Sequence, residues 1–270
     1  MKKILIIAEI GWNHMGNISL AKKMIFQAKK SGADICKFQT WSEKNLKPGP
    51  WDTDGRREIY KKAELTKENH IYLIEECKNN NVEFLTSVFD KESLEFLKNI
   101  GIKKIKIPSH EIYNLELISL ACEIFDEVLI STGASKWEEI LDLNKKIESK
   151  NAVYLHCVSS YPCSPEIINL PKFIQLQKLF DKVGYSGHLQ GIDDAIAAIV
   201  LGAVCVEKHF TIDNKLPGRD NQFAILPQNL KDLFLFRNSF QKMNINLGLD
   251  LQSGERDIYD NYRGRWSKDA

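Results

Sequence analysis

The sequence lacks the features that would place it among nucleic-acid-binding, membrane or secreted proteins. Its formal net charge is only +1, from 37 basic and 36 acidic residues, so its composition favours neither nucleic acid nor an anionic membrane as a partner. No apolar run approaches the roughly 18 residues of a membrane-spanning helix. The apolar run at residues 4–8 ends at Glu9, with no small-residue cleavage site after it, which argues against a signal peptide. We therefore expect a cytoplasmic protein.

The sequence also lacks a Cys-x-x-Cys pair. Of its six cysteines, Cys36, Cys157 and Cys205 lie inside apolar runs, which is typical of buried, reduced thiols. A chain of 270 residues can bury a sizeable core, so the fold needs neither a disulfide nor a structural metal.

What the sequence does contain is a regular alternation of short apolar runs with amphipathic segments. The β-like runs occupy residues 4–10, 33–39, 82–87, 103–109, 127–132, 152–157, 182–186 and 204–209. Helical spacing marks residues 18–28, 67–80, 91–100, 114–124, 136–149, 170–180 and 192–201. Eight strands with intervening helices predict an α/β fold, a closed (β/α)8 TIM barrel. We expect the barrel domain over residues 1–245 and a tail over residues 246–270 that packs on the barrel or on a partner subunit.

One connection is long and irregular. Residues 40–66 include Pro48, Pro50 and Gly55 and show no sustained period. A loop of this length in a compact domain is usually a lid or a binding loop.

Almost every predicted strand ends in polar residues that are able to do chemistry. These residues include Glu9, Lys37, Gln39, Ser87, Lys106, Ser109, Glu111, Ser131, Thr132, His156, Ser159, Tyr161, Ser186, His188, Glu207 and His209. One polar strand end often only caps the next helix. Eight such ends converge on one face of a barrel, where active sites of this fold lie, so we expect a shared site there.

Two lysines lie within apolar strands. Burying Lys37 or Lys106 without an anion is costly. One interpretation is a pair of buried salt bridges with Glu9, Glu111 or Glu207. The other is a pocket for a small, highly charged anion, and we favour it because salt bridges alone would not require the nearby hydroxyls of Ser87, Ser109, Ser131 and Ser186.

Two histidines end the last two predicted strands, which are neighbours in a barrel. His188 and His209 could bind one divalent ion, with substrate or water at the open positions. They could equally form a hydrogen-bonded pair or act as general acid and base. Their spacing alone does not decide between these interpretations. His14 and His156 are weaker candidates, and we expect His70 on an exposed helix face.

Several segments resemble, in order, the motifs of the sialic acid synthases. Residues 8–16, AEIGWNHMG, resemble the opening AEIGxNHxG of that family, and residues 33–40 resemble its GADxxKFQT segment. Further matches lie at residues 106–111, 129–133, 155–157, 161–162, 183–188, 207–211 and 216–220. Together they span residues 8–220, and the chain is similar to the family's catalytic barrel.

The resemblance implies a transferase that condenses phosphoenolpyruvate with an N-acyl amino-sugar aldehyde, of the N-acetylmannosamine type, to give a nonulosonic acid for a surface glycan. It implies a divalent metal, typically Mn²⁺ with Mg²⁺ or Co²⁺ as alternatives, on His188 and His209. We assign catalysis to Glu111, Lys106 and Glu9, with Glu111 activating water. The substrate-binding residues we expect are Lys37, Gln39, Ser87, Phe89, Ser109, Ser131, Thr132, Ser159, Tyr161, Ser186 and Asp220. The alternatives are condensation with a different aldose, or a non-catalytic sugar-binding or regulatory barrel.

The sequence departs from the family's pattern at a few places. Gly187 stands where Asp is usual, His110 where a small residue is usual, and Ser159 where Asn is frequent. Members of the family carry a C-terminal antifreeze-like domain that reaches a partner's barrel, for which a sequence ending at Ala270 has no room. We expect a homodimer, in which the tail at residues 261–266 or a separate antifreeze-like partner protein completes the sugar end of the site.

Overall fold

Eight parallel strands close into a barrel in the computed structural model, which describes residues 3–147 and 149–266. The strands are β1 Leu5–Glu9, β2 Ile35–Thr40, β3 Glu83–Val88, β4 Lys104–Ile107, β5 Glu127–Ser131, β6 Ala152–Cys157, β7 Val183–Gly187 and β8 Cys205–His209. Each strand pairs with the next, and β8 returns to β1, where His209 lies opposite Glu9. The predicted TIM barrel is confirmed.

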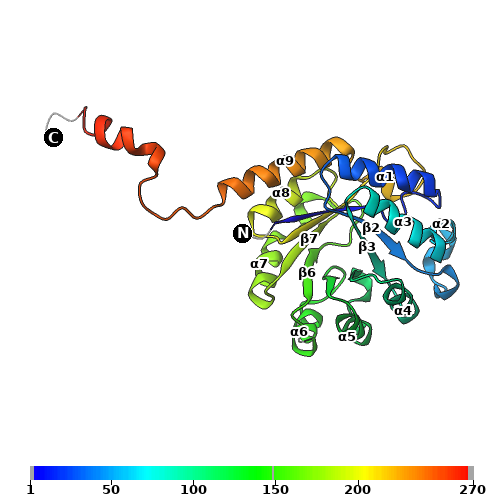
Figure 1. Ribbon diagram of the computed structural model, residues 1–270. Helices are drawn as coiled ribbons and strands as arrows, with labels where there is room; N and C mark the ends of the chain where they lie inside the picture. The colour runs from blue at the N-terminus through cyan, green and yellow to red at the C-terminus, as the bar shows by residue number, and fades with distance from the viewer. Residues whose placement is uncertain (1–2, 148, 267–270) are drawn as a thin grey trace.

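Helices surround the barrel (Figure 1). They are α1 Ile18–Lys30, α2 Arg56–Ala63, α3 Lys67–Asn79, α4 Lys91–Asn99, α5 Leu115–Ile124, α6 Trp137–Lys146, α7 Leu170–Leu179, α8 Asp193–Val200 and α9 Pro227–Met243. The side chains of Asn17, Thr66, Asp90 and Asn114 each accept a hydrogen bond from a backbone N–H of the helix that follows. Such caps define helix starts. The helices predicted from periodicity are confirmed, whereas α2 and α9 were not predicted.

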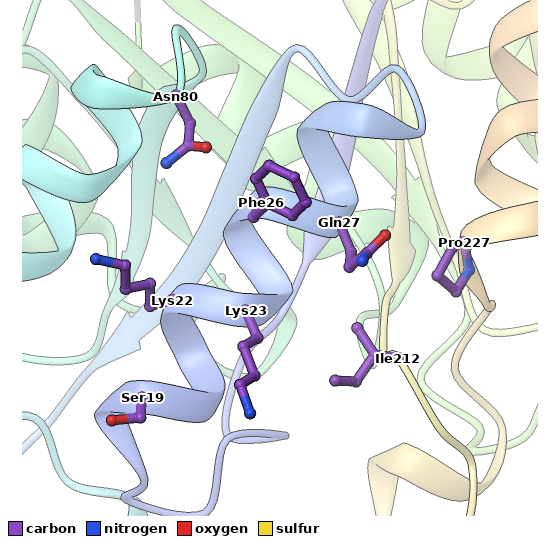
Figure 2. Close-up of a pocket in the computed structure, with 8 residues that line it drawn as sticks. All are labelled: Ser19, Lys22, Lys23, Phe26, Gln27, Asn80, Ile212 and Pro227. Atoms are coloured by element: carbon purple, nitrogen blue, oxygen red, sulfur yellow. The ribbon is translucent and has the colours of Figure 1, made fainter.

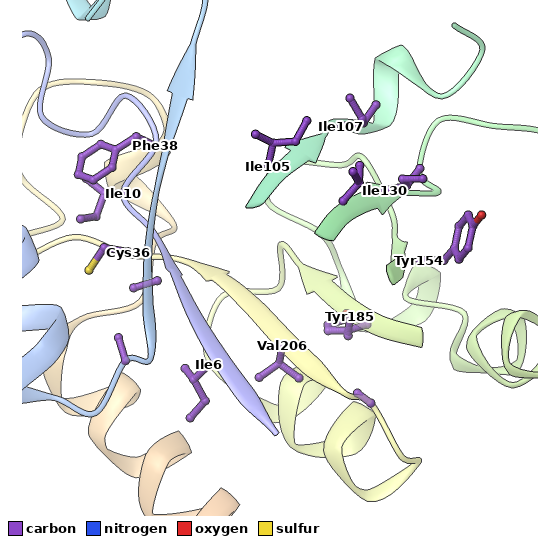
Figure 3. Close-up of a cluster of buried hydrophobic side chains, with 14 of the residues drawn as sticks. Ile6, Ile10, Cys36, Phe38, Ile105, Ile107, Ile130, Tyr154, Tyr185 and Val206 are labelled. Carbon is purple, nitrogen blue, oxygen red and sulfur yellow. The ribbon is translucent and has the colours of Figure 1, made fainter. Parts of the chain in front are cut away.

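Two apolar layers lie on opposite sides of the barrel wall, because successive strand residues point to opposite faces. The outer layer packs the strands against the helices and includes Ile6, Cys36 and Val206, as Figure 3 shows. The inner layer fills the barrel and includes Ile7 and Leu129. The inner layer supports the floor of the site.

The expectation for His70 is wrong. Its side chain is buried, and its ring nitrogens lie 2.8 Å from Thr40 Oγ1 and 2.8 Å from the Thr66 carbonyl oxygen. His70 shares the buried face of α3 with Leu73 and Cys77, at the i, i+3, i+7 spacing of an amphipathic helix. Its hydrogen bonds satisfy the polar atoms of the ring in that position.

The tail leaves the barrel after α9 and extends away from it (Figure 1). Ile245, Leu247 and Leu249 have exposed fractions of 58%, 70% and 105%. The predicted tail, residues 246–270, is thus largely exposed over its described part, residues 246–266, and packing on a partner subunit stays a prediction. In the part of the chain that the structure describes, no helix is long and apolar enough to cross a membrane.

Candidate active site

A cavity of about 210 Å³ lies at the carboxyl ends of the strands. Most of the predicted site residues line it: Glu9, Lys37, Gln39, Ser87, Phe89, Lys106, Ser109, Ser131, Tyr161, Ser186, His188, His209 and Asp220. Strand alternation explains their direction. Ile105 and Ile107 pack in the outer layer, so Lys106 between them must point inward.

The two lysines meet at one carboxylate, that of Glu207. Glu207 Oε1 accepts hydrogen bonds from Lys106 Nζ at 2.6 Å and from Ser186 Oγ at 2.9 Å, and Glu207 Oε2 lies 3.8 Å from Lys37 Nζ. Lys37 Nζ also lies 2.7 Å from Glu9 Oε2. The salt bridges considered from the sequence therefore exist, with Glu9 and Glu207 as partners.

Hydroxyls surround this charged cluster. Lys37 Nζ donates to Ser87 Oγ at 3.1 Å. Ser131 Oγ is buried and has no hydrogen-bond partner among the described residues. A buried hydroxyl without a partner is uncommon in a folded protein, and this one lines the cavity. Hydroxyls and two ammonium groups together form a suitable lining for a small polyanion.

The carboxyls in the cavity differ in their affinity for protons. Burial alone would raise the pKa of Glu207, but Lys106 and Lys37 outweigh it and lower that pKa to about 2. Burial prevails at Glu9, whose pKa is raised. Burial, reinforced by Glu9, raises the pKa of Asp220 to about 7. Glu207 thus stays ionised, whereas Glu9 and Asp220 take up a proton more readily and leave positive charge available to an anion.

The rings of His188 and His209 lie side by side, with centroids 5.4 Å apart. His188 Nδ1 lies 2.8 Å from the Val158 carbonyl oxygen, and His209 Nδ1 lies 3.4 Å from Asp220 Oδ2. The acceptor at His188 Nδ1 favours the tautomer in which Nε2 of that ring is free to bind a metal, whereas His209 Nδ1 has no hydrogen-bond partner among the described residues. No group of three or more His, Cys, Asp or Glu side chains could hold a metal ion in the described ranges. In the described part of the chain, His188 and His209 remain as two candidate ligands, and a metal here would need substrate or water for the rest.

The long connection after β2 supplies the mouth of the cavity. Arg56 and Tyr60 of α2 line it, and the Tyr60 ring packs edge-on against Trp12 with centroids 5.1 Å apart. Arg219, from the segment after β8, also lines it. Sequence reasoning did not select these residues. The charged and aromatic residues at positions 51–60 were the feature of the sequence that could have indicated a role for this loop in the site.

Three predicted residues do not line the cavity. Glu111 ends the 3-10 turn Ser109–Glu111; with about three residues per turn, Ser109 and His110 face the cavity and Glu111 does not. Thr132 Oγ1 donates to the Leu155 carbonyl oxygen at 3.0 Å, which gives it a structural role. Ser159 lies beside Gly133. Glu111, Thr132 and Ser159 thus lie outside the lining of the cavity, and the roles expected of them stay predictions.

A larger depression, of about 710 Å³, lies on the outside of the helical layer. Figure 2 shows Lys22, Lys23 and Phe26 of α1 in it. Lys22 Nζ is paired with Glu76 Oε1 at 2.9 Å. The depression contains no convergent set of buried polar groups, so the chemistry of the molecule belongs to the cavity in the barrel.

Comparisons with known proteins show which chains this one is similar to. The sequence matches the NeuB family over residues 24–246. It is 38% identical over 259 residues to the N,N'-diacetyllegionaminic acid synthase of Campylobacter jejuni, across 90% of this chain and 78% of that protein. It is 35% identical over 259 residues to the N-acetylneuraminate-9-phosphate synthase of Drosophila melanogaster, across 90% and 69% of the two chains. The crystal structure of N-acetylneuraminic acid synthetase from Leptospira borgpetersenii, in complex with citrate, aligns with a TM-score of 0.87 at 31% identity, over 98% of this chain and 93% of that one.

Proposed function

This chain belongs to the NeuB family, and we propose that it condenses phosphoenolpyruvate with an N-acyl amino-sugar aldehyde, in a metal-dependent reaction that gives a nonulosonic acid and phosphate. The main support for the proposal is that the side chains of Lys37 and Lys106 are both buried in the cavity, beside several hydroxyl groups. Its relatives that make legionaminic and neuraminic acids support a sugar of this class.

Phosphoenolpyruvate fits the lysine end of the cavity by charge. Its phosphate and carboxylate need cationic and hydroxyl donors, and Lys37, Lys106 and the Ser131 hydroxyl provide both kinds. A bound anion would compete with Glu9 for the ammonium group of Lys37, which lies 2.7 Å from Glu9 Oε2. The ionised Glu207 would remain to hold Lys106 in place.

The sugar fits the opposite, aromatic end. Trp12, Tyr60 and Phe89 line that part of the cavity, and aromatic faces pack against sugar rings and acyl groups. The guanidinium groups of Arg56 and Arg219 suit hydroxyl and carbonyl oxygens of the sugar. We assign acceptor recognition to this rim.

A divalent ion, which we propose to be Mn²⁺, would be held by His188 and His209 and would polarise the aldehyde carbonyl. The orientation of His188 Nδ1 toward the Val158 carbonyl oxygen, and the 5.4 Å separation of the two ring centroids, support this assignment.

Two carboxyls are placed to move protons. As C3 of phosphoenolpyruvate bonds to the aldehyde carbon, the aldehyde oxygen takes up a proton, and water then adds at C2 before phosphate leaves. Asp220, with a pKa of about 7, can hold the first proton near neutral pH. Glu9 takes the place of Glu111 as the group that would accept a proton from the attacking water.

The test is a turnover assay with phosphoenolpyruvate, Mn²⁺ and a panel of free and phosphorylated N-acyl amino sugars, in which phosphate release is measured and products are identified by mass spectrometry. We expect one sugar to give a nine-carbon acid. Lys104→Met is a suitable control for Lys106→Met, because Lys104 lies on the same strand but pairs with Glu83 at 3.0 Å and Glu127 at 3.1 Å outside the cavity. Turnover only with another aldose, or binding without turnover, would contradict the proposal.

A further inference from the structure

The side-chain space of Gly187 is filled by another residue. A Cβ atom built on Gly187 would lie 2.2 Å from Asp194 Oδ2 and 2.5 Å from Tyr185 Cε1. Gly187 is not among the glycines with positive φ, so its backbone would accept a side chain. Two groups exclude a side chain here: the carboxylate of Asp194, which enters from the first turn of α8, and the ring edge of Tyr185.

That carboxylate is paired with a buried lysine on the neighbouring strand. Lys208 Nζ lies 2.8 Å from Asp194 Oδ2 and 3.0 Å from Asp194 Oδ1. Tyr185 Oη also donates to Asp194 Oδ2, at 3.2 Å. Lys208 and Asp194 each have an exposed fraction of 2%, so neither can exchange its partner for solvent.

The same ammonium binds the chain beyond β7. Lys208 Nζ donates to the Leu189 carbonyl oxygen at 2.7 Å. Leu189 directly follows His188, and Lys208 directly precedes His209. One buried cation therefore ties together the two segments that carry the two histidines, and Asp194 holds that cation in place.

We propose that Asp194, acting through Lys208, is a positioning residue that fixes the separation and direction of His188 and His209. This inference rests on the proposed function, in which the two histidines bind a divalent ion. Without the Asp194 carboxylate, Lys208 would be a buried cation with only a carbonyl partner, a costly state. The lysine would move toward solvent, and the Leu189 carbonyl oxygen would lose its donor.

The register of β7 and β8 allows the carboxylate to be moved from position 194 to position 187 without a change in total charge. Gly187 and Lys208 are Cα partners in the pairing of β7 with β8, so an aspartate at position 187 would lie beside Lys208. The resemblance to sialic acid synthases leads to the expectation of Asp at that position. In this chain, Asp194 supplies the carboxylate from the helix instead.

The experiment measures Mn²⁺ binding by titration calorimetry, without substrate, on the full chain and on four variants: Asp194→Asn, Asp194→Ala, Gly187→Asp, and Gly187→Asp combined with Asp194→Ala. Asp194→Asn should weaken Mn²⁺ binding by about 10-fold or more, the lower end of the effect of removing groups that orient metal ligands. Gly187→Asp alone should also weaken Mn²⁺ binding, because the new carboxylate and that of Asp194 would compete for one space. Gly187→Asp combined with Asp194→Ala should recover most of the affinity that each single change loses.

Kinetics and stability separate positioning from a merely structural role. We expect Asp194→Asn to raise the Mn²⁺ concentration needed for half-maximal turnover and to leave the KM for phosphoenolpyruvate nearly unchanged. Asp34→Asn is the matched control, because it removes a different ion pair with a buried partner, at 2.8 Å from Arg237 Nη1. It should lower the thermal midpoint without changing Mn²⁺ affinity.

The possible failures are distinguishable. If the unmodified protein binds no Mn²⁺, the metal-dependent function is wrong, and the positioning role with it. If the unmodified protein binds Mn²⁺ and folded Asp194→Asn binds it equally well, or if the combined variant is no better than Asp194→Ala, only the positioning role is overturned.

Discussion

Residues inside the barrel show what strand periodicity can and cannot predict. The inward direction of Lys37 and Ser87 follows from alternation along β2 and β3, so the sequence was sufficient to bring them to one site. Glu111 and Ser159 follow strand ends, where the local turn decides which way a side chain points. Arg219 was missed for the same reason, because it reaches the cavity from a long segment after β8.

Lys106 gives the first prediction. Lys106→Met should raise the KM for phosphoenolpyruvate strongly. It should also lower stability by about 3 kcal/mol, the effect of removing one member of a buried ion pair, because Glu207 loses its nearest cation. Adding Glu207→Gln should restore much of the stability, measured by denaturant unfolding, but not the affinity for phosphoenolpyruvate. Recovery of both quantities in the double variant would identify Lys106 as purely structural.

His14 gives a prediction on pH. Burial lowers the pKa of His14 from 6.5 to about 4, so the unfolded chain takes up a proton first as the pH falls. The corresponding stability is complete above pH 6.5 and is lost as the pH falls toward 4. At about 1.4 kcal/mol for each pKa unit, the loss reaches about 3 kcal/mol.

His14→Gln, which cannot ionise, should lose less stability between pH 7 and pH 4.5 than the unmodified protein does. Unfolding free energies from urea titrations at several pH values measure the two slopes. Equal slopes would show that the ring does not become harder to protonate on folding.

At the scale of elements, the two helices that sequence periodicity missed have different causes. The α2 helix lies in a connection rich in proline, glycine and charge, and Ala63 is its one buried residue. The α9 helix buries Leu230 and Leu233, and it is also held by Arg237, which is almost fully buried. Arg237 Nη1 donates to the Ile4 carbonyl oxygen at 2.6 Å and to Asp34 Oδ2 at 2.8 Å. Such a long-range contact is not visible in a local pattern.

The α9 helix should therefore depend on this one guanidinium. Arg237→Met keeps much of the apolar stem but leaves Asp34 without its buried partner, so we expect a loss of about 3 kcal/mol in the free energy of unfolding. The KM for either substrate should not change, because Ile4 and Asp34 lie at the amino ends of the strands, away from the cavity. If Arg237→Met changed the KM for a substrate but left the free energy of unfolding unchanged, Arg237 would act on the site and not on the stability of the fold.

For the whole molecule, the barrel was predictable because eight repeats of strand and helix leave few alternative architectures. The position of the tail was not. Phe240 and Asn244, at the end of α9, line one cavity with Ile4 and Leu5 at the amino end of β1, so the tail begins at the opposite end of the barrel from the catalytic cavity. The tail is therefore not placed to cover the site of its own chain. The prediction that remains is that the tail contacts a partner subunit.

The last prediction concerns what the tail does. Ile245, Leu247, Leu249 and Leu251 occupy every second position of the segment after α9 and are all exposed, and clustered exposed apolar side chains mark interaction surfaces. We expect the full chain to be a homodimer held partly by this segment. Deletion of residues 245–270 should leave the thermal midpoint of the barrel nearly unchanged, because the described part of this segment, residues 245–266, is largely exposed. The deletion should also convert the dimer to a monomer in light scattering. Leu247→Ser combined with Leu249→Ser, which keeps the chain length, should weaken the dimer in the same way.

If Arg263 and Arg265 of the partner reach the sugar end of the site, the monomer should show a higher KM for the sugar and an unchanged KM for phosphoenolpyruvate. A truncated chain that remains dimeric would show that the contact between subunits lies on the barrel.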